Sequence, residues 1–184
     1  MAKVYAFLAD GLEEVECLAV VDVLRRSGVE VTLVSVTGST QIEGSHGIRL
    51  LADRLFEEVN PGEADLLFLP GGMPGTKNLG EHKGLEAAIQ CANKQGRRIG
   101  AICAAPSILG SMGLLKGRTA TCYPGFEDQL TGVSYTSQGV VTDGNITTSR
   151  GLGYALDMGL EIIRLLQGQQ QAQRIAESIQ YRWQ

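Results

Sequence analysis

Apolar residues occur along this chain in short continuous runs that alternate with segments of helical spacing. The continuous runs lie at residues 4–9, 29–36, 64–69 and 98–103. Strands buried on both faces have this near-continuous apolar character, so each run predicts an inner strand of a mainly parallel sheet. Residues 12–28 and 84–98 repeat apolar positions every three or four residues, which predicts amphipathic helices.

The rest of the chain predicts hairpins and helices. Residues 41–53 alternate around Gly44 and Gly47, and residues 140–151 have Asp143 and Gly144 at the tip of a second hairpin. Further elements are predicted at residues 120–130 (a short strand and a turn), 152–168 (a helix) and 169–184 (a polar surface helix). Strands alternating with helices indicate an α/β protein with helices on both faces of its sheet, which we predict as one domain over residues 1–184.

The amino-acid composition of the chain argues against several classes of function. The formal net charge is -4, without the basic excess of a nucleic-acid-binding protein. No apolar run approaches the roughly 20 residues that span a bilayer, and we expect a cytoplasmic protein without a membrane or nucleic-acid partner. The four cysteines have no CxxC spacing and only two histidines accompany them, so we expect no metal, no cofactor and no disulfide framework.

The most informative segment is IGAICAAPSIL, where a predicted strand passes into a helix with almost no loop between them. Small residues surround Cys103 at this junction, as in a nucleophile elbow, whose tight turn leaves no room for bulk. The start of the helix also points free N–H groups and its positive dipole end at the sulfur. We therefore predict that Cys103 is an activated nucleophile.

Glycine-rich turns follow two other predicted strands. Gly11 follows the first strand, and Gly71 and Gly72 follow the strand that ends near residue 69. Ligands of open parallel sheets bind at the carboxyl ends of the strands. We expect these turns and Cys103 to converge on one crevice, where the N–H groups of Gly72 and Ala104 are candidate donors to a developing oxyanion.

The histidines do not supply a base for Cys103. His46 and His82 both precede it, so the sequence lacks the downstream histidine of a Cys-His-acid triad. We interpret both as solvated loop residues. The absence of a later histidine also sets aside a glutaminase of the class I amidotransferase type.

Carboxylates are the alternative partners. Glu13, Glu14 and Glu16 follow the first strand, where acidic residues complement the helix dipole. Glu13 and Glu16 share a helix face, but the residues alone do not show which side chain points inward. Taken by themselves, the residues favour solvated side chains for all three.

Four motifs, LADGLEEVE, LPGG, AICAAP and TSRGLG, occur in that order over the whole chain. In these motifs the chain resembles the ThiJ/PfpI superfamily, in the branch of the parkinsonism-associated protein deglycase. The resemblance implies a flavodoxin-like three-layer α/β/α sandwich. It also implies a homodimer whose interface involves the first helix, including Arg26, and the hairpin that contains His46.

The resemblance also implies residue roles. Cys103 matches the family nucleophile, and Glu16 matches the glutamate that hydrogen-bonds it and would act as general acid and base. Gly72 and Ala104 match the backbone oxyanion donors. The glyoxalase-active members have a histidine just before the proline of the strand after the nucleophile helix, where this chain has Tyr123. We keep Tyr123 as a candidate that orients a substrate oxygen through its hydroxyl.

Pairing Glu16 with Cys103 has an electrostatic consequence. Two anions in contact repel, so we expect the pair to share one proton, as a Cys103 thiolate beside a neutral Glu16. Burial raises the pKa of a carboxyl, and a helix N-terminus lowers the pKa of a thiol, so both effects favour this arrangement.

Two functions are compatible with Cys103 and Glu16 as the central residues of the site. The first is a cofactor-independent glyoxalase or deglycase acting on methylglyoxal-like α-oxoaldehydes, or on their early adducts with thiols and amines, a substrate class implied by the resemblance. The second is a redox sensor or stress chaperone in which Cys103 is oxidised to a sulfinate held by a neutral Glu16. Cys17 and Cys122 are predicted as buried apolar fillers, with Cys122 as a resolving thiol if it reaches Cys103.

Overall fold

A seven-stranded sheet in the order β10-β11-β7-β6-β1-β2-β5 forms the centre of the protein. The computed structural model describes residues 1–183. The strands of the sheet are β1 (Lys3–Leu8), β2 (Glu30–Ser35), β5 (Arg54–Leu55), β6 (Leu66–Leu69), β7 (Arg98–Ile102), β10 (Val140–Asp143) and β11 (Ile146–Ser149). Every neighbouring pair is parallel except β10 with β11, which confirms the mainly parallel sheet.

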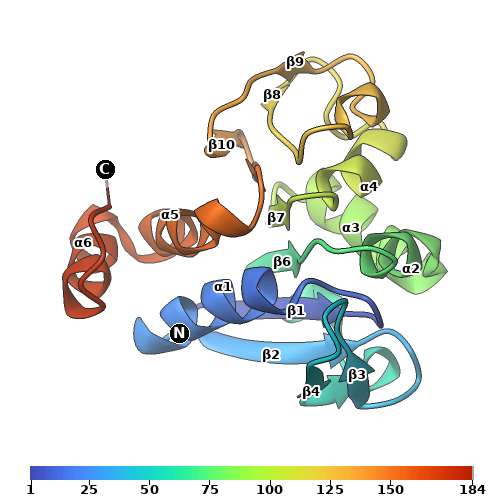
Figure 1. Ribbon diagram of the computed structural model, residues 1–184, viewed down its shortest axis with the longest axis horizontal. Coiled ribbons are helices and arrows are strands. Elements are labelled where there is room, and N and C mark those ends of the chain that lie inside the picture. Colours follow the sequence, from blue (N-terminus) through green and yellow to red (C-terminus); the bar gives the residue numbers. More distant parts are fainter. Residues whose placement is uncertain (184) are drawn as a thin grey trace.

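Helices cover both faces of this sheet (Figure 1). One side carries α1 (Glu14–Arg26), α5 (Ala155–Gln167) and α6 (Gln169–Ser178), and the other carries α2 (Gly75–Glu81), α3 (Lys83–Lys94) and α4 (Pro106–Ser111). Each side encloses its own cluster of buried apolar side chains against the strands. The three-layer α/β/α sandwich is therefore confirmed.

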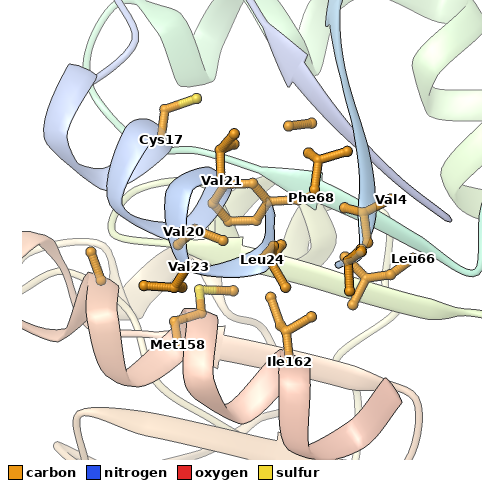
Figure 2. Close-up of a cluster of buried hydrophobic side chains, with 14 of the residues drawn as sticks. Val4, Cys17, Val20, Val21, Val23, Leu24, Leu66, Phe68, Met158 and Ile162 are labelled. Atoms are coloured by element: carbon orange, nitrogen blue, oxygen red, sulfur yellow. The ribbon is translucent and has the colours of Figure 1, made fainter. Parts of the chain in front are cut away.

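The cluster under α1 and α5 shows why these helices pack closely. Val20 and Val23 of α1 face Met158 of α5 (Figure 2), and all three side chains are buried. Gly159 lies at the crossing, where a Cβ atom would collide with the side chain of Val23. The glycine therefore lets the two helices approach. Cys17 belongs to the same cluster, as expected of a buried filler.

Smaller elements complete the chain. The first predicted hairpin forms a separate antiparallel pair, β3 (Gln41–Glu43) and β4 (Arg49–Leu51), and the predicted turn at Asp143 and Gly144 joins β10 to β11. The remaining short elements are β8 (Thr119–Ala120), β9 (Ser134–Tyr135) and the 3-10 helices η1 (Phe56–Glu58), η2 (Pro61–Glu63), η3 (Glu127–Gln129) and η4 (Leu152–Tyr154).

Three elements differ from the sequence predictions. Helix α2 was not predicted, because four of its seven residues are glycine, threonine or asparagine, which have weak helix propensity. The predicted strand within residues 120–130 is reduced to the end of β8. The last helix ends at Ser178, and Gln184 lies outside the described residues. Within residues 1–183, no helix has the length and apolar character needed to cross a membrane.

The close crossing of α1 and α5 leads to a stability prediction. Gly159→Ala is expected to lower the free energy of unfolding by about 1 to 3 kcal/mol, because the added methyl group overpacks the contact with Val23. Gly80→Ala in α2 is the matched control, since its Cβ would lie at an ordinary 3.5 Å from Ile108. Urea denaturation of the two variants measures the difference. Equal stability of the two would show that the helices have room to separate.

Candidate active site

Cys103 lies at the turn between β7 and α4 in a strained backbone conformation. Its φ angle is 64°, in the left-handed region that side chains other than glycine rarely adopt. Two backbone hydrogen bonds hold this turn: the N–H of Cys103 donates to the Ser149 carbonyl at 2.8 Å, and the N–H of Tyr123 donates to the Cys103 carbonyl at 2.8 Å. The geometry of a nucleophile elbow, predicted from the small neighbours of Cys103, is present.

The two glycine-rich turns interlock beside this elbow. The N–H of Glu13 donates to the Gly71 carbonyl at 2.9 Å, and the N–H of Gly75 donates to the Gly11 carbonyl at 3.0 Å. Gly72 has a φ angle of 90°, and a Cβ atom there would collide with the backbone of Glu13. The turns after β1 and β6 therefore meet at backbone distance, as the sequence predicted.

Gly71 brings Cys103 and Glu16 together. A Cβ atom at Gly71 would lie 2.5 Å from Cys103 Cβ and 2.5 Å from Glu16 Oε2, so only glycine fits between them. Glu16 Oε1 faces the chain at Gly151, where a Cβ atom would be 3.8 Å away. The site thus joins α1, the turn after β6, the elbow and the turn after β11.

All three glutamates of the first helical turn are buried, so the expectation of solvated side chains is wrong. Glu13 is 8% exposed, and Glu14 and Glu16 are each 1% exposed. The interlocked turns and the β3–β4 hairpin cover this end of the helix, which the residues of α1 alone could not show. Glu13 caps the helix, because its Oε2 accepts the N–H of Glu16 at 2.6 Å.

Glu14 anchors the hairpin. It accepts the backbone N–H groups of His46 at 2.8 Å and Ile48 at 3.3 Å, and His46 Nδ1 lies 3.1 Å from its other oxygen. Burial alone would raise the pKa of Glu14, but hydrogen bonds from its own backbone N–H and from His46 lower it to about 2. Glu14 is therefore a structural anion at neutral pH.

The environment of Glu16 raises its pKa, whereas that of Glu14 lowers it. Burial raises the pKa of Glu16 to about 7, and the neighbouring charge of Glu13 adds to this effect. Hydrogen bonding with Cys103 and with the backbone of Gly71 and Leu152 acts in the other direction. Oε2 of Glu16 is buried and has no hydrogen-bond partner of good geometry among residues 1–183. A carboxyl with this pKa suits proton transfer at neutral pH.

The prediction of a lowered pKa for Cys103 is wrong while Glu16 is ionised. Burial, the negative charge of Glu16 and the hydrogen bond to Glu16 raise the pKa of the Cys103 thiol to about 12. The N–H groups of Gly72 and Ala104 lower it, as predicted, but by less. Protonation of Glu16 would remove the opposing charge. With these pKa values, the proton of the pair rests on the sulfur, and the expected arrangement of a Cys103 thiolate beside a neutral Glu16 is wrong for the resting site.

The other sequence candidates lie farther from this pair. Tyr123 is 50% exposed, and its ring borders Gly151 at the edge of the site. Cys122 is buried, and burial together with the charge of Glu127 raises the pKa of its thiol to about 11, so it is an unreactive filler in this structure. Its role as a resolving thiol stays a prediction.

The histidines have structural contacts. His46 is exposed, as expected, but it contacts Glu14. His82 differs from the expectation of a solvated loop residue, because its Nδ1 accepts the N–H of Leu85 at 3.0 Å and its ring packs on Phe56. Ligand atoms of Glu13, Glu14 and His46 lie within 4.8 Å of one another, but hydrogen bonds already occupy both oxygens of Glu14. We assign no metal to this group.

The residues expected near a dimer interface lie on the surface. Arg26 is exposed and pairs with Asp22 at 2.6 Å. Exposed apolar side chains occur on α1 and on or next to β4, namely Val15, Leu18, Ile48 and Leu51. Such side chains suit a protein interface. The homodimer itself stays a prediction.

Gly71 was expected only to lie at the crevice, and the backbone of Leu152 had no predicted role in the site. Both contact Glu16. The LPGG and TSRGLG motifs that contain them are visible in the sequence, but backbone groups give no residue-type signal of their own.

Comparisons with known proteins identify the family and agree with this fold. The model of the DJ-1/PfpI family matches residues 2–165. The chain belongs to the DJ-1/PfpI family. A solved structure of oxidized DJ-1 from Toxoplasma gondii superposes with a TM-score of 0.95, at 34% identity over 100% of both chains, and the fold is accordingly flavodoxin-like.

The curated relatives differ in how much of their own length this chain covers. Protein DJ-1 homolog B from Arabidopsis thaliana is 37% identical over 95% of this chain, but the chain spans only 40% of that relative. A protein named as a deglycase from Pyrococcus abyssi is 37% identical over 89% of this chain and 99% of its own length.

The pKa of Glu16 is raised and that of Glu14 is lowered. Glutamine substitutions at the two residues are therefore predicted to change the free energy of unfolding with opposite pH dependence. The folded state holds a proton on Glu16 between its ordinary pKa near 4.5 and about 7, so ionising Glu16 costs stability as the pH rises through this window. Glu16→Gln should therefore gain about 3 kcal/mol relative to the native protein between pH 4.5 and pH 8. Urea denaturation at both pH values measures this gain.

Glu14→Gln is the matched control with the reverse sign. Ionised Glu14 stabilises the fold above its ordinary pKa of 4.5, and this contribution is lost as the pH falls toward about 2. The variant should be less stable than the native protein at pH 7 and approach it in acid. The same pH trend in both variants would contradict the assigned environments.

Proposed function

We propose that the protein is a cysteine-dependent, cofactor-independent enzyme of the glyoxalase or deglycase type. Its substrates are methylglyoxal-like α-oxoaldehydes or their early adducts with thiols and amines. The observation that carries the proposal is the contact between Cys103, strained at a nucleophile elbow, and a buried Glu16 whose pKa is about 7. The relative from Pyrococcus abyssi, named as a deglycase, supports the choice of substrate class.

The first step joins sulfur to the aldehyde carbon. Ionised Glu16 takes the thiol proton as Cys103 attacks, because a base with a pKa near the working pH transfers protons efficiently. The N–H groups of Gly72 and Ala104 stabilise the oxyanion that forms. Glu16 then returns the proton to this oxygen, and the product is a hemithioacetal with Glu16 ionised again.

The second step moves hydrogen between the two carbons. Glu16 takes the proton from the former aldehyde carbon, which gives an enediolate, and delivers it to the neighbouring carbon. The hydroxyl proton of the former aldehyde carbon passes to the ketone oxygen, so that no proton is gained or lost overall. The aldehyde carbon is thereby oxidised to a thioester while the ketone carbon is reduced to an alcohol. Water cleaves the thioester, releases lactate and restores the thiol. Tyr123, half exposed at the edge of the site, is a candidate to orient the ketone oxygen.

Lactate formation from methylglyoxal without glutathione tests this proposal. We expect turnover by the native protein to rise with pH as Glu16 ionises near pH 7, and to disappear in Cys103→Ser. Glu16→Gln should reduce the rate by about 10² to 10⁴, the usual contribution of an acid–base group. The same variant should alkylate faster at Cys103, because it removes the charge that raises the thiol pKa.

The control is Cys91→Ser, which removes an exposed thiol on α3 and should retain full activity. Lactate is the required product, since any thiol binds an aldehyde reversibly. Absence of lactate from the native protein would reject the glyoxalase reaction. Slower alkylation in Glu16→Gln would contradict the charge of Glu16 as a cause of the raised Cys103 pKa.

A second candidate function is oxidation sensing. The related structure from Toxoplasma gondii is of oxidized DJ-1, and Cys103 is partly exposed beside a carboxyl that can donate a hydrogen bond when neutral. A sulfinate at Cys103 would accept that hydrogen bond, together with those of Gly72 and Ala104.

Mild peroxide treatment followed by intact-mass and peptide spectrometry tests this function. We expect two oxygen atoms to be added at Cys103, and this product to be lost in Glu16→Leu, which cannot donate a hydrogen bond to it. Cys91 is the internal control, because its thiol is exposed but lacks these partners. Equal oxidation of Cys91 and Cys103 would contradict sensing.

A further inference from the structure

A cavity of about 340 Å³ lies between β10, the start of α5 and the C-terminal segment. Its lining residues are Gly139, Val140, Tyr154, Asp157, Glu161 and Trp183. The cavity does not include Cys103 or Glu16. It is nevertheless connected to the turn that contacts Glu16, because the N–H of Tyr154 donates to the Gly151 carbonyl at 2.8 Å.

The two carboxylates of the cavity have different partners. Glu161 forms a two-point ion pair with Arg164, at 2.7 and 2.8 Å, and also accepts the Thr142 hydroxyl at 2.8 Å. Asp157 accepts only the Tyr181 hydroxyl, at 2.7 Å, and has no ion pair within residues 1–183. The charge of Glu161 is thus neutralised, whereas that of Asp157 is available to a ligand.

Two aromatic side chains, Tyr154 and Trp183, also line the cavity. Tyr154 is exposed and packs over Gly139, where a Cβ atom would collide with its ring. Trp183 is partly buried against the apolar cluster of α5 and α6. The faces of such rings attract cations and also bury apolar groups.

We propose that this cavity binds an alkylammonium group. Asp157 provides the opposite charge, and the rings of Tyr154 and Trp183 provide electron-rich walls for the carbon atoms around the nitrogen. An anionic ligand would meet Asp157 directly, and a neutral apolar one would leave that carboxylate without compensation. The alkylammonium group can belong to a free amine or to a lysine side chain.

Tryptophan fluorescence tests the proposal directly, because Trp183 is the only tryptophan in the chain. The probes are choline and its neutral isostere 3,3-dimethylbutan-1-ol, which differ in charge but hardly in shape. Choline should change the fluorescence saturably and bind at least about tenfold more tightly than the isostere. Equal affinities, or no saturable change with choline, would overturn the proposal.

The variant Asp157→Asn tests whether the charge of Asp157, rather than its hydrogen bond to Tyr181, determines choline binding. Asparagine keeps an acceptor for the Tyr181 hydroxyl but removes the charge, so choline should bind about tenfold more weakly while the isostere binds unchanged. Asp128→Asn, in η3 and outside the cavity, is the control and should bind choline as the native protein does. Unchanged choline binding in Asp157→Asn would overturn the assignment.

Two further binding measurements identify the source of the ammonium group and test whether the cavity acts separately from Cys103. Nα-acetyl-lysine amide presents the lysine group, and whichever of this probe and choline binds more tightly identifies the source of the ammonium group. Cys103→Ser should bind choline with native affinity. Binding therefore succeeds or fails independently of turnover at Cys103, and loss of binding in Cys103→Ser would overturn the assignment of a separate site.

Discussion

The close contact of Gly71 with Cys103 and Glu16 is the constraint on which the candidate site depends. A side chain at residue 71 would occupy the space between the sulfur-bearing residue and the carboxyl. Without that space, Glu16 could not lie within reach of the thiol. The backbone hydrogen bonds between the turns after β1 and β6 maintain this contact. The proposed chemistry thus depends on backbone packing as much as on the side chains of Cys103 and Glu16.

Three glutamates on one helical turn show how environment decides the role of a residue. Glu14 receives several donors and stays ionised, Glu13 caps the helix, and Glu16 is buried with one oxygen that lacks a conventional hydrogen-bond partner. All three have the same side chain and nearly the same depth. The hydrogen-bond donors around the carboxyl, rather than burial alone, therefore determine that the pKa of Glu14 falls while that of Glu16 rises.

Much of the fold could be predicted from the sequence, because continuous apolar runs and helical spacing follow directly from burial on two faces or on one. The elbow at Cys103 was also visible, since its small neighbours are local in sequence. Burial of the glutamates was not, because the hairpin and turns that cover them come from distant segments. Helix α2 escaped prediction for a similar reason: tertiary contacts, rather than propensity, stabilise it. The thiol pKa was mispredicted because the local helix effect is smaller than burial and the charge of Glu16.

The parts of the site are widely separated along the chain, at residues 16, 71, 103 and 151. Strand β11, which precedes the last of these, must pair with β7 before Gly151 and Leu152 can reach Glu16. During synthesis, the N-terminal segments emerge from the ribosome well before this strand does. In a nascent chain, Glu16 and Cys103 therefore lack the contacts of Gly151 and Leu152, and the site is complete only once residues 1–152 have folded.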